Sequence, residues 1–117
     1  MTRRGDVVIV AFPFADGSRA KNRPALVVQG DRGNGRLQNT IVAMITGNLR
    51  GIGDPTQLLV DPTTTDGQPS GLNQPSAVKC ENLYTVARRH ISRTIGHLPP
   101  PLMAKVDDAL KAALELS

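Results

Sequence analysis

The sequence has little of what secreted, metal-binding or membrane proteins usually need. Its 117 residues include a single cysteine, Cys80, which excludes an internal disulfide and a zinc site built from several cysteines. Cys80 stands in a stretch of alternating apolar and polar residues, so we expect it to be buried. No stretch approaches the roughly 20 apolar residues of a membrane span, and the N-terminus turns acidic at Asp6 before any signal-like segment develops. These features predict a cytoplasmic protein without membrane association.

The motifs of several large enzyme classes are also missing. The chain has no phosphate-binding P-loop, no glycine-rich dinucleotide fingerprint and no His-x-x-x-His metal pair. No cluster of carboxylates or histidines is present that would hold magnesium for a two-metal reaction, so we expect metal-independent chemistry and no cofactor. The two histidines, His90 and His97, remain an alternative acid/base pair, although lone histidines at loop edges are more often surface or capping residues.

Aromatic side chains make up only 3% of the chain, namely Phe12, Phe14 and Tyr84. Proteins that bind single-stranded nucleic acid often stack bases on such rings. Phe14 comes just after the first apolar run, so it is the candidate platform for a base. Core or dimer packing is its alternative role.

The charge is distributed unevenly along the chain. Residues 1–50 hold eight Lys and Arg against three acids, which is +5, whereas residues 51–117 hold six against seven, which is −1. The total is +4. A basic half suits a polyanionic partner, because Lys and Arg release condensed counterions when they meet phosphates. A solvated basic face is the alternative.

Short apolar runs separated by turn-forming residues predict a series of β-strands. The expected strands cover residues 7–12, 24–29, 40–46, 57–60 and 77–83, with 84–86 and Ile91 as further edge pieces. Asp31–Gly35 is expected to be a turn. Residues 47–55 and 61–75 are expected to be loops.

The C-terminal part changes to a helical period. Leu102, Val106, Ala109 and their apolar neighbours up to Leu114 recur at spacings of three and four residues, and Pro100 or Pro101 fits the first turn. Several strands ahead of one helix indicate a mainly β fold, a small and strongly bent antiparallel barrel with a C-terminal helix. The length predicts a single domain, residues 1–117.

A set of segments, in order along the chain, carries a family pattern. They are Arg3–Val8, Gly17-Ser18, Arg23–Val28, Asp31 with Asn34, Ile41–Thr46, Gly71–Val78, Asn82, Thr85-Val86 and Ile95–Leu98, followed by the terminal helix. The chain thereby resembles the PemK/MazF family of toxin–antitoxin ribonucleases over nearly its whole length. The resemblance implies an SH3-like, PemK-type barrel, a homodimer, sequence-specific cleavage of single-stranded messenger RNA, and a cognate acidic antitoxin.

The resemblance also implies an active centre made of Arg23 and Thr46. A guanidinium binds two phosphate oxygens at once and stabilises the charge that builds up while a 2′-hydroxyl attacks the phosphorus. Thr46 would hold a phosphate oxygen or orient the hydroxyl. Judged without the family pattern, Arg23 would be a solvated loop residue and Thr46 an ordinary strand end.

The expected RNA-binding residues lie mainly in and next to the first loop. They are Phe14, Asp16, Ser18, Arg19, Lys21 and, farther along the chain, Asn82. Many relatives place a glutamate directly after the Gly-Ser of this loop, where this chain has Arg19, and the loop is one residue short. Because arginine keeps its proton, it does not replace this glutamate as a general base. The sequence leaves the identity of the base undecided, and Asp16, relaying through Ser18, is a candidate.

The same kind of barrel also supports functions other than RNA cleavage. Relatives poison a topoisomerase such as DNA gyrase through protein contacts, so a non-catalytic toxin or binding module is the alternative function. The pairing of Arg23 with Thr46 favours the nuclease. The missing glutamate leaves open a homologue that has lost cleavage.

Overall fold

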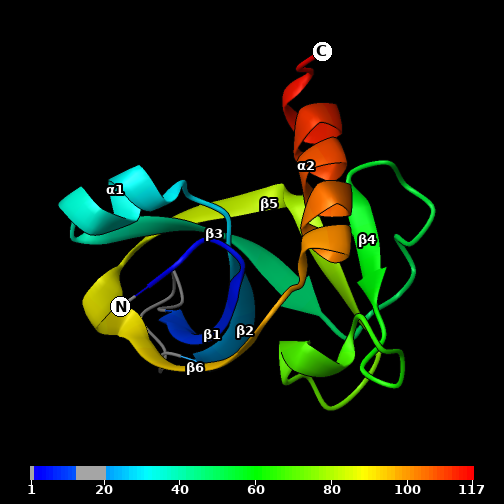
Figure 1. Cartoon of the computed structure of the whole chain (residues 1–117), viewed down its shortest axis with the longest axis horizontal. Helices are drawn as coiled ribbons and strands as arrows, with labels where there is room; N and C mark the ends of the chain where they lie inside the picture. The colour runs from blue at the N-terminus through cyan, green and yellow to red at the C-terminus, as the bar shows by residue number, and fades with distance from the viewer. Residues whose placement is uncertain (1, 13–20) are drawn as a thin grey trace.

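The computed structural model describes residues 2–12 and 21–117. Its elements, in chain order, are β1 (Asp6–Phe12), β2 (Lys21–Val27), α1 (Asp31–Arg36), β3 (Asn39–Thr46), β4 (Gln57–Val60), η1 (Gln68–Ser70), β5 (Ser76–Ala87), η2 (Arg88–His90), β6 (Ile91–His97) and α2 (Pro100–Leu114). The strands form one antiparallel sheet in the order β4-β5-β3-β2-β1-β6. The sheet curls into a small barrel, and α2 stands beside it against β4 and β5 (Figure 1). The expected mainly β fold with a C-terminal helix is confirmed.

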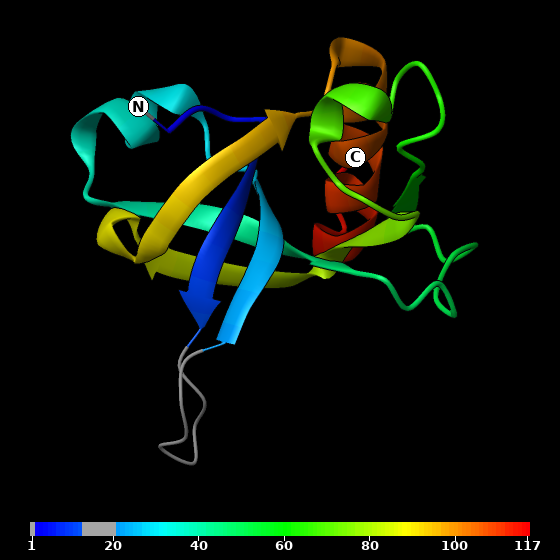
Figure 2. The same cartoon turned by 90° about the horizontal axis from the view of Figure 1, so that it is seen from below.

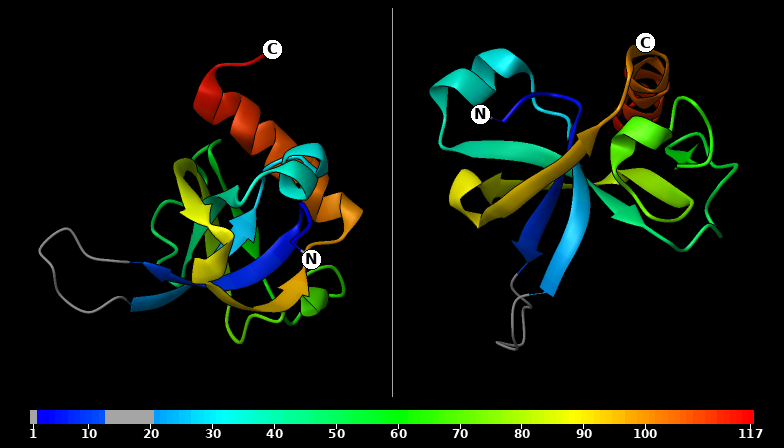
Figure 3. Two further views of the ribbon diagram at one scale, coloured as in Figure 1. Left: turned by 90° about the vertical axis from the view of Figure 1, so that its left-hand side faces the viewer. Right: turned by 60° about the horizontal axis from the view of Figure 1, so that its bottom comes forward.

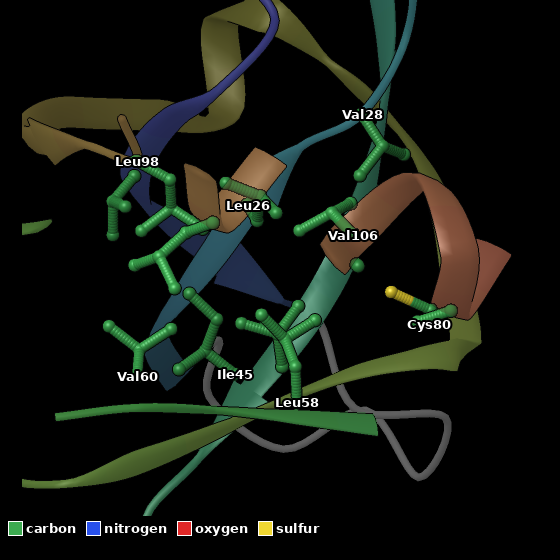
Figure 4. Close-up of a cluster of buried hydrophobic side chains, with 13 residues drawn as sticks. Leu26, Val28, Ile45, Leu58, Val60, Cys80, Leu98 and Val106 are labelled. Carbon is green, nitrogen blue, oxygen red and sulfur yellow. The ribbon is translucent and has the colours of Figure 1, made fainter. Parts of the chain in front are cut away.

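The larger core lies between one face of the sheet and α2. Leu102, Val106 and Ala109, which share one stripe of α2, are buried against strand residues such as Leu26 and Ile45. Figure 4 shows Leu26, Ile45 and Val106 converging, with the sulfur of Cys80 pointing into the cluster. Cys80 is 1% exposed, and burial raises the pKa of its thiol to about 11, so it is a packing residue as expected.

The smaller core fills the inside of the barrel. It consists of six buried residues, with Phe12 and Ile91 packed against them: Val8, Val10, Ala25, Val27, Val42 and Val86. They come from the opposite face of the same strands, because side chains alternate along a strand. Figure 2 shows β1 and β2 side by side at the barrel wall, with α2 outside it. The middle of the sheet is therefore buried on both faces.

The expectation of a simple turn at Asp31–Gly35 is wrong, because residues 31–36 form the short helix α1. The buried amide of Asn34 holds this helix in place. Its Nδ2 donates to Gln29 O at 3.0 Å and to Asp31 Oδ1 at 3.1 Å, and its Oδ1 accepts the Thr40 hydroxyl at 2.7 Å. Tertiary hydrogen bonds thus override a local sequence that has two glycines and a weak helix preference. Figure 3 shows α1 over one end of the barrel.

Three strand boundaries also differ from those expected. The second strand, expected at residues 24–29, is β2 (Lys21–Val27), so Pro24 stands inside the strand opposite Ile9 instead of at its start. Residues 77–83 and 84–86 are not separate pieces but one long strand, β5, which carries an irregular step. The expected single edge residue Ile91 begins the full strand β6. Its middle residues, Ser92, Arg93 and Thr94, are all exposed, so β6 lacks the apolar alternation that reveals a strand. In the part of the chain that the structure describes, no helix is long and apolar enough to cross a membrane.

Candidate functional site

Arg23 and Thr46 lie near the ends of adjacent strands of the sheet. Arg23, near the start of β2, pairs with Val10 of β1. On its other side β2 pairs with β3 as far as Ala25 and Met44, and Arg23 and Thr46 each lie two residues beyond this last pair, Thr46 as the last residue of β3. The two residues that the family resemblance singles out therefore lie at neighbouring ends of adjacent strands.

Arg23 and Thr46 also share one face of the sheet. Directly opposed residues of an antiparallel pair point to the same side, so Arg23 lies on the side of Val10, which belongs to the smaller core. Thr46 lies on the same side, because its neighbour Ile45 points into the larger core. Both side chains are half-buried. They stand where the apolar lining of this face gives way to solvent.

A pocket of about 240 Å³ opens beside Thr46. It is lined by two cationic side chains and four uncharged residues: Thr46, Asn48, Arg50, Gly51, Gln57 and Lys79. Within residues 2–12 and 21–117, the only ion pair joins Arg4 to Asp107 at 2.7 Å. Arg23, Arg50 and Lys79 are therefore not neutralised by any carboxylate of the described chain. Such a site favours an anionic ligand.

The loop that follows β3 is ordered by its own hydrogen bonds. The backbone N–H of Asn48 donates to the Thr46 hydroxyl oxygen at 3.1 Å, and the backbone N–H of Arg50 donates to Asn48 Oδ1 at 3.0 Å. Because Thr46 accepts this bond, its own hydroxyl proton stays free to donate. Gly51 lies tightly against the side-chain amide of Gln57, where a Cβ would collide. The loop thus holds Arg50 beside β4 and β5.

An aromatic pair lies farther along the same face. Phe12 and Tyr84 meet edge to face, with ring centroids 5.3 Å apart, and Tyr84 is 44% exposed. They help to line a second pocket of about 350 Å³ together with His90. Phe12 is opposite Lys21 and two residues from Val10, the partner of Arg23. An exposed ring this close to the strand ends is suited to stacking on a base.

The other residues expected from the sequence are placed as follows. Phe14, Asp16, Ser18 and Arg19 fall in residues 13–20, outside the described part of the chain. Lys21 is exposed at the start of β2. Asn82 is half-buried in the irregular step of β5.

The two histidines lie apart from each other. His90 faces the aromatic pocket, while His97 pairs with Asp6, at the opposite end of β1 from Val10 and Arg23. This arrangement does not bring them together as an acid/base pair.

Arg50 and Lys79 are site residues that sequence reasoning missed. Arg50 is one of many basic residues, and it lies in a loop whose path depends on hydrogen bonds to Asn48. Lys79 occupies a polar position in an alternating strand, which is typical of a solvated face. Their shared position beside Thr46 depends on strand register, which a single sequence does not reveal. Within residues 2–12 and 21–117, no three His, Cys, Asp or Glu side chains form a group that could hold a metal ion.

Comparison with known proteins places this geometry in a family. A model of PemK-like, MazF-like toxins of type II toxin–antitoxin systems matches residues 3–114. The chain is similar to endoribonuclease MazF9 of Mycobacterium tuberculosis, with 34% identity over 122 residues that cover 99% of this chain and 98% of the relative. It is also similar to endoribonuclease EndoA of Bacillus subtilis, with 31% identity over 117 residues that cover 99% and 97%.

Solved structures agree with this result. The Mycobacterium tuberculosis toxin MazF-mt6 matches with a TM-score of 0.76 and 30% identity, over 96% of this chain and 98% of that one. A mycobacterial endoribonuclease in complex with its cognate antitoxin matches with a TM-score of 0.80 over 100% and 98%, and at 22% identity this likeness concerns the fold. On the family match and the two full-length relatives, the chain belongs to the PemK-like, MazF-like toxins of type II toxin–antitoxin systems.

Proposed function

We propose that this protein is a metal-independent endoribonuclease that cuts single-stranded messenger RNA at short sequence motifs. The observation that carries the proposal is the placement of Arg23 and Thr46 on one face, at the neighbouring ends of β2 and β3. The neighbouring basic pocket supports it, because its lining contains no acid that would repel a phosphate. The names of the two similar curated proteins agree with this chemistry.

In the proposed reaction the ribose 2′-hydroxyl is the nucleophile. Its oxygen forms a bond to the adjacent phosphorus while the bond from phosphorus to the 5′-oxygen breaks, which leaves a 2′,3′-cyclic phosphate and a 5′-hydroxyl end. Arg23 binds two phosphate oxygens and stabilises the extra negative charge of the transition state. Thr46 donates its hydroxyl proton to a phosphate oxygen or orients the nucleophile.

Two proton transfers complete the reaction. A general base takes the proton of the 2′-hydroxyl, and the leaving 5′-oxygen gains a proton. Arg23 stays charged throughout, because a guanidinium keeps its proton in proteins. Asp16, relayed through Ser18, is the base that the sequence offers.

The proposal is tested with a long unstructured RNA incubated with the protein in EDTA. We expect discrete cuts whose products carry a 2′,3′-cyclic phosphate. A matched RNA with hydrogen in place of the 2′-hydroxyl at one mapped cut should be resistant there and still be cut elsewhere. Efficient cutting at the deoxy position, or a requirement for added metal, would contradict the mechanism.

We also propose that the protein acts as a homodimer. Large apolar side chains remain exposed near the site, among them Leu49 at 39% and Ile52 at 36% in the loop after β3. A two-fold pair would cover such side chains and build one RNA groove from two protomers. Sedimentation equilibrium should show twice the 12.5 kDa chain mass at micromolar concentration. A fully active 12.5 kDa species would argue against the dimer.

We further propose that an acidic antitoxin, made in the same cytoplasm, inhibits the protein. One solved structure similar in fold is a mycobacterial endoribonuclease in complex with its cognate antitoxin. A flexible acidic segment would order itself along the basic face that carries Arg23 and Lys79, in place of RNA. Antitoxin should therefore compete with an uncleavable RNA for binding. Simultaneous binding of both at saturation would contradict an overlapping site.

A further inference from the structure

The position of Lys79 results from a break in the register of β5. Ala43 pairs with Leu83, but the next residue of β3, Met44, pairs with Lys79, so three residues of β5 have no partner on β3. Those three are Cys80, Glu81 and Asn82. An insertion of an odd number of residues reverses which side chains face each side of a sheet. Without the break, Lys79 would lie on the face of Ala43, in the larger core.

The break instead sets Lys79 on the face of Thr46. Lys79 is opposite Met44, and Thr46 lies two residues farther along β3, so Lys79 and Thr46 are diagonal neighbours. The backbone of the irregular segment is held by a hydrogen bond from the Cys80 amide to Thr56 O, 3.0 Å long. Natural proteins use such bulges to redirect a side chain next to a functional site.

The closest acid in sequence, Glu81, forms no ion pair with Lys79 among the described residues. Glu81 Oε2 accepts a hydrogen bond of 2.6 Å from Gln57 Nε2, and Glu81 does not line the pocket. Lys79 shares the pocket with Arg50, which comes from the ordered loop on the other side. Two cations around about 240 Å³ repel one another until an anion enters.

We propose that Lys79 and Arg50 bind an RNA phosphate next to the one that is cut. This proposal rests on the proposed ribonuclease function and adds to it a second phosphate site. Arg23, which holds the reacting phosphate, is on β2, and β3 separates it from Lys79 on β5. Lys79 and Arg50 therefore position the RNA without contacting the reacting atoms. They should therefore determine affinity and salt dependence, and leave the chemical step to Arg23 and Thr46.

The test is a double-mutant cycle between the protein and the RNA. One RNA carries deoxyribose at the cut site, so that it binds without being cut, and single uncharged methylphosphonate linkages are placed in turn at the flanking positions. Each RNA is bound to wild type, Lys79→Gln, Arg50→Gln and the control Lys105→Gln, which removes an equal charge from exposed α2. Thermal unfolding of each variant checks that the fold is retained.

We expect one flanking linkage whose neutralisation weakens binding to wild type about fivefold, the upper range for an exposed ion pair. The same linkage should cost clearly less in Lys79→Gln and in Arg50→Gln, because only one of the two cations remains, and it should cost the full amount in Lys105→Gln. The slope of the logarithm of the binding constant against the logarithm of the salt concentration should become shallower by about 0.7 in each site variant. On cleavable RNA, KM should rise while kcat stays unchanged.

The outcomes separate the two proposals. Suppose that wild type cuts RNA, but that at every flanking position the loss of affinity from the neutral linkage and the loss from the variant simply add. The second phosphate site would then be overturned. A fall in kcat without a change in affinity would also overturn it, because Lys79 would then act on the reaction itself. If wild type cuts no RNA in EDTA, the ribonuclease function fails instead.

Discussion

The two faces of β3 serve different purposes. One face presents Ala43 and Ile45 to the larger core, where both are buried in the cluster that α2 completes. The other presents Val42 to the inside of the barrel and then ends in Met44 and Thr46, which no helix covers. The closed face provides stability through apolar burial. The open end holds polar and charged groups that folding does not need, which is typical of a functional site.

This contrast predicts that stability and cleavage can be changed separately. Substitutions on the α2 side should lower the free energy of unfolding and leave the cleavage rate of folded protein intact. Substitutions at the open strand ends should do the reverse.

The largest stability effect is expected from Leu102→Ala. Leu102 is buried between α2 and the sheet, and removing its side chain leaves a cavity that costs about 3 kcal/mol. Urea unfolding measures the loss, with Leu114→Ala as control, since Leu114 lies on the same helix but is 54% exposed. The control should change stability by less than about 0.5 kcal/mol. A loss of single-turnover rate in folded Leu102→Ala would mean that the two faces are coupled.

The largest effect on cleavage is expected from Arg23→Lys. Lysine keeps the positive charge, so RNA affinity should be largely retained, but it lacks the planar fork that holds two phosphate oxygens. Loss of such a transition-state contact costs on the order of 100-fold in rate. Single-turnover cleavage at saturating enzyme measures this, with Arg32→Lys on α1 as control. A wild-type rate for Arg23→Lys would exclude Arg23 as the catalytic group.

The sequence predicted most of the fold because its strands follow simple patterns. The run Val7–Phe12 and the stripe of α2 were both identified from apolar spacing. The helix α1 was missed because a buried amide, Asn34, stabilises it through hydrogen bonds to Gln29 and Thr40, which flank the helix and which apolar spacing does not reveal. The strand β6 was missed because its exposed residues lack alternation.

The site was harder to predict from the sequence than the fold, for a related reason. Arg23 and Thr46 came from a family resemblance, and their placement at neighbouring strand ends follows from strand register, which local sequence does not determine. Lys79 faces the site only because β5 contains an irregular step. The roles of Asp16 and Arg19 remain predictions, because residues 13–20 lie outside the described structure.

A smaller effect on cleavage is expected from Thr46→Val. The change keeps the shape of the side chain and removes its hydroxyl, so one neutral hydrogen bond to the substrate is lost, about 1 kcal/mol or fivefold to tenfold in rate. The strand should stay folded, because valine suits a strand at least as well as threonine. Thr94→Val, exposed on β6, is the matched control. Equal rates for wild type and Thr46→Val would leave Thr46 with a structural role only.

The smallest effect concerns Asp31, at the end of the molecule away from the open strand ends. Asp31 Oδ1 accepts hydrogen bonds from the Arg4 amide at 2.7 Å and from Asn34 Nδ2 at 3.1 Å. The Arg4 backbone bond is the main reason that the pKa of Asp31 lies below its ordinary value of 3.8. A carboxyl group whose pKa is lower in the folded state stabilises the fold above about pH 4, and this contribution disappears as the pH falls through the folded value.

Asp31→Asn should therefore reduce the loss of stability as the pH falls below about 4, while cleavage at pH 7 stays unchanged. Urea unfolding across this range measures the effect, and Asp108→Asn, exposed on α2, controls for the removal of one negative charge. The Asp31 variant should show a shallower decline than both wild type and the control, because it alone lacks the carboxylate that the Arg4 amide holds. Identical acid profiles for all three proteins would show that this bond does not contribute to stability. A change in cleavage at pH 7 would instead mean that the end of the barrel near α1 influences the site.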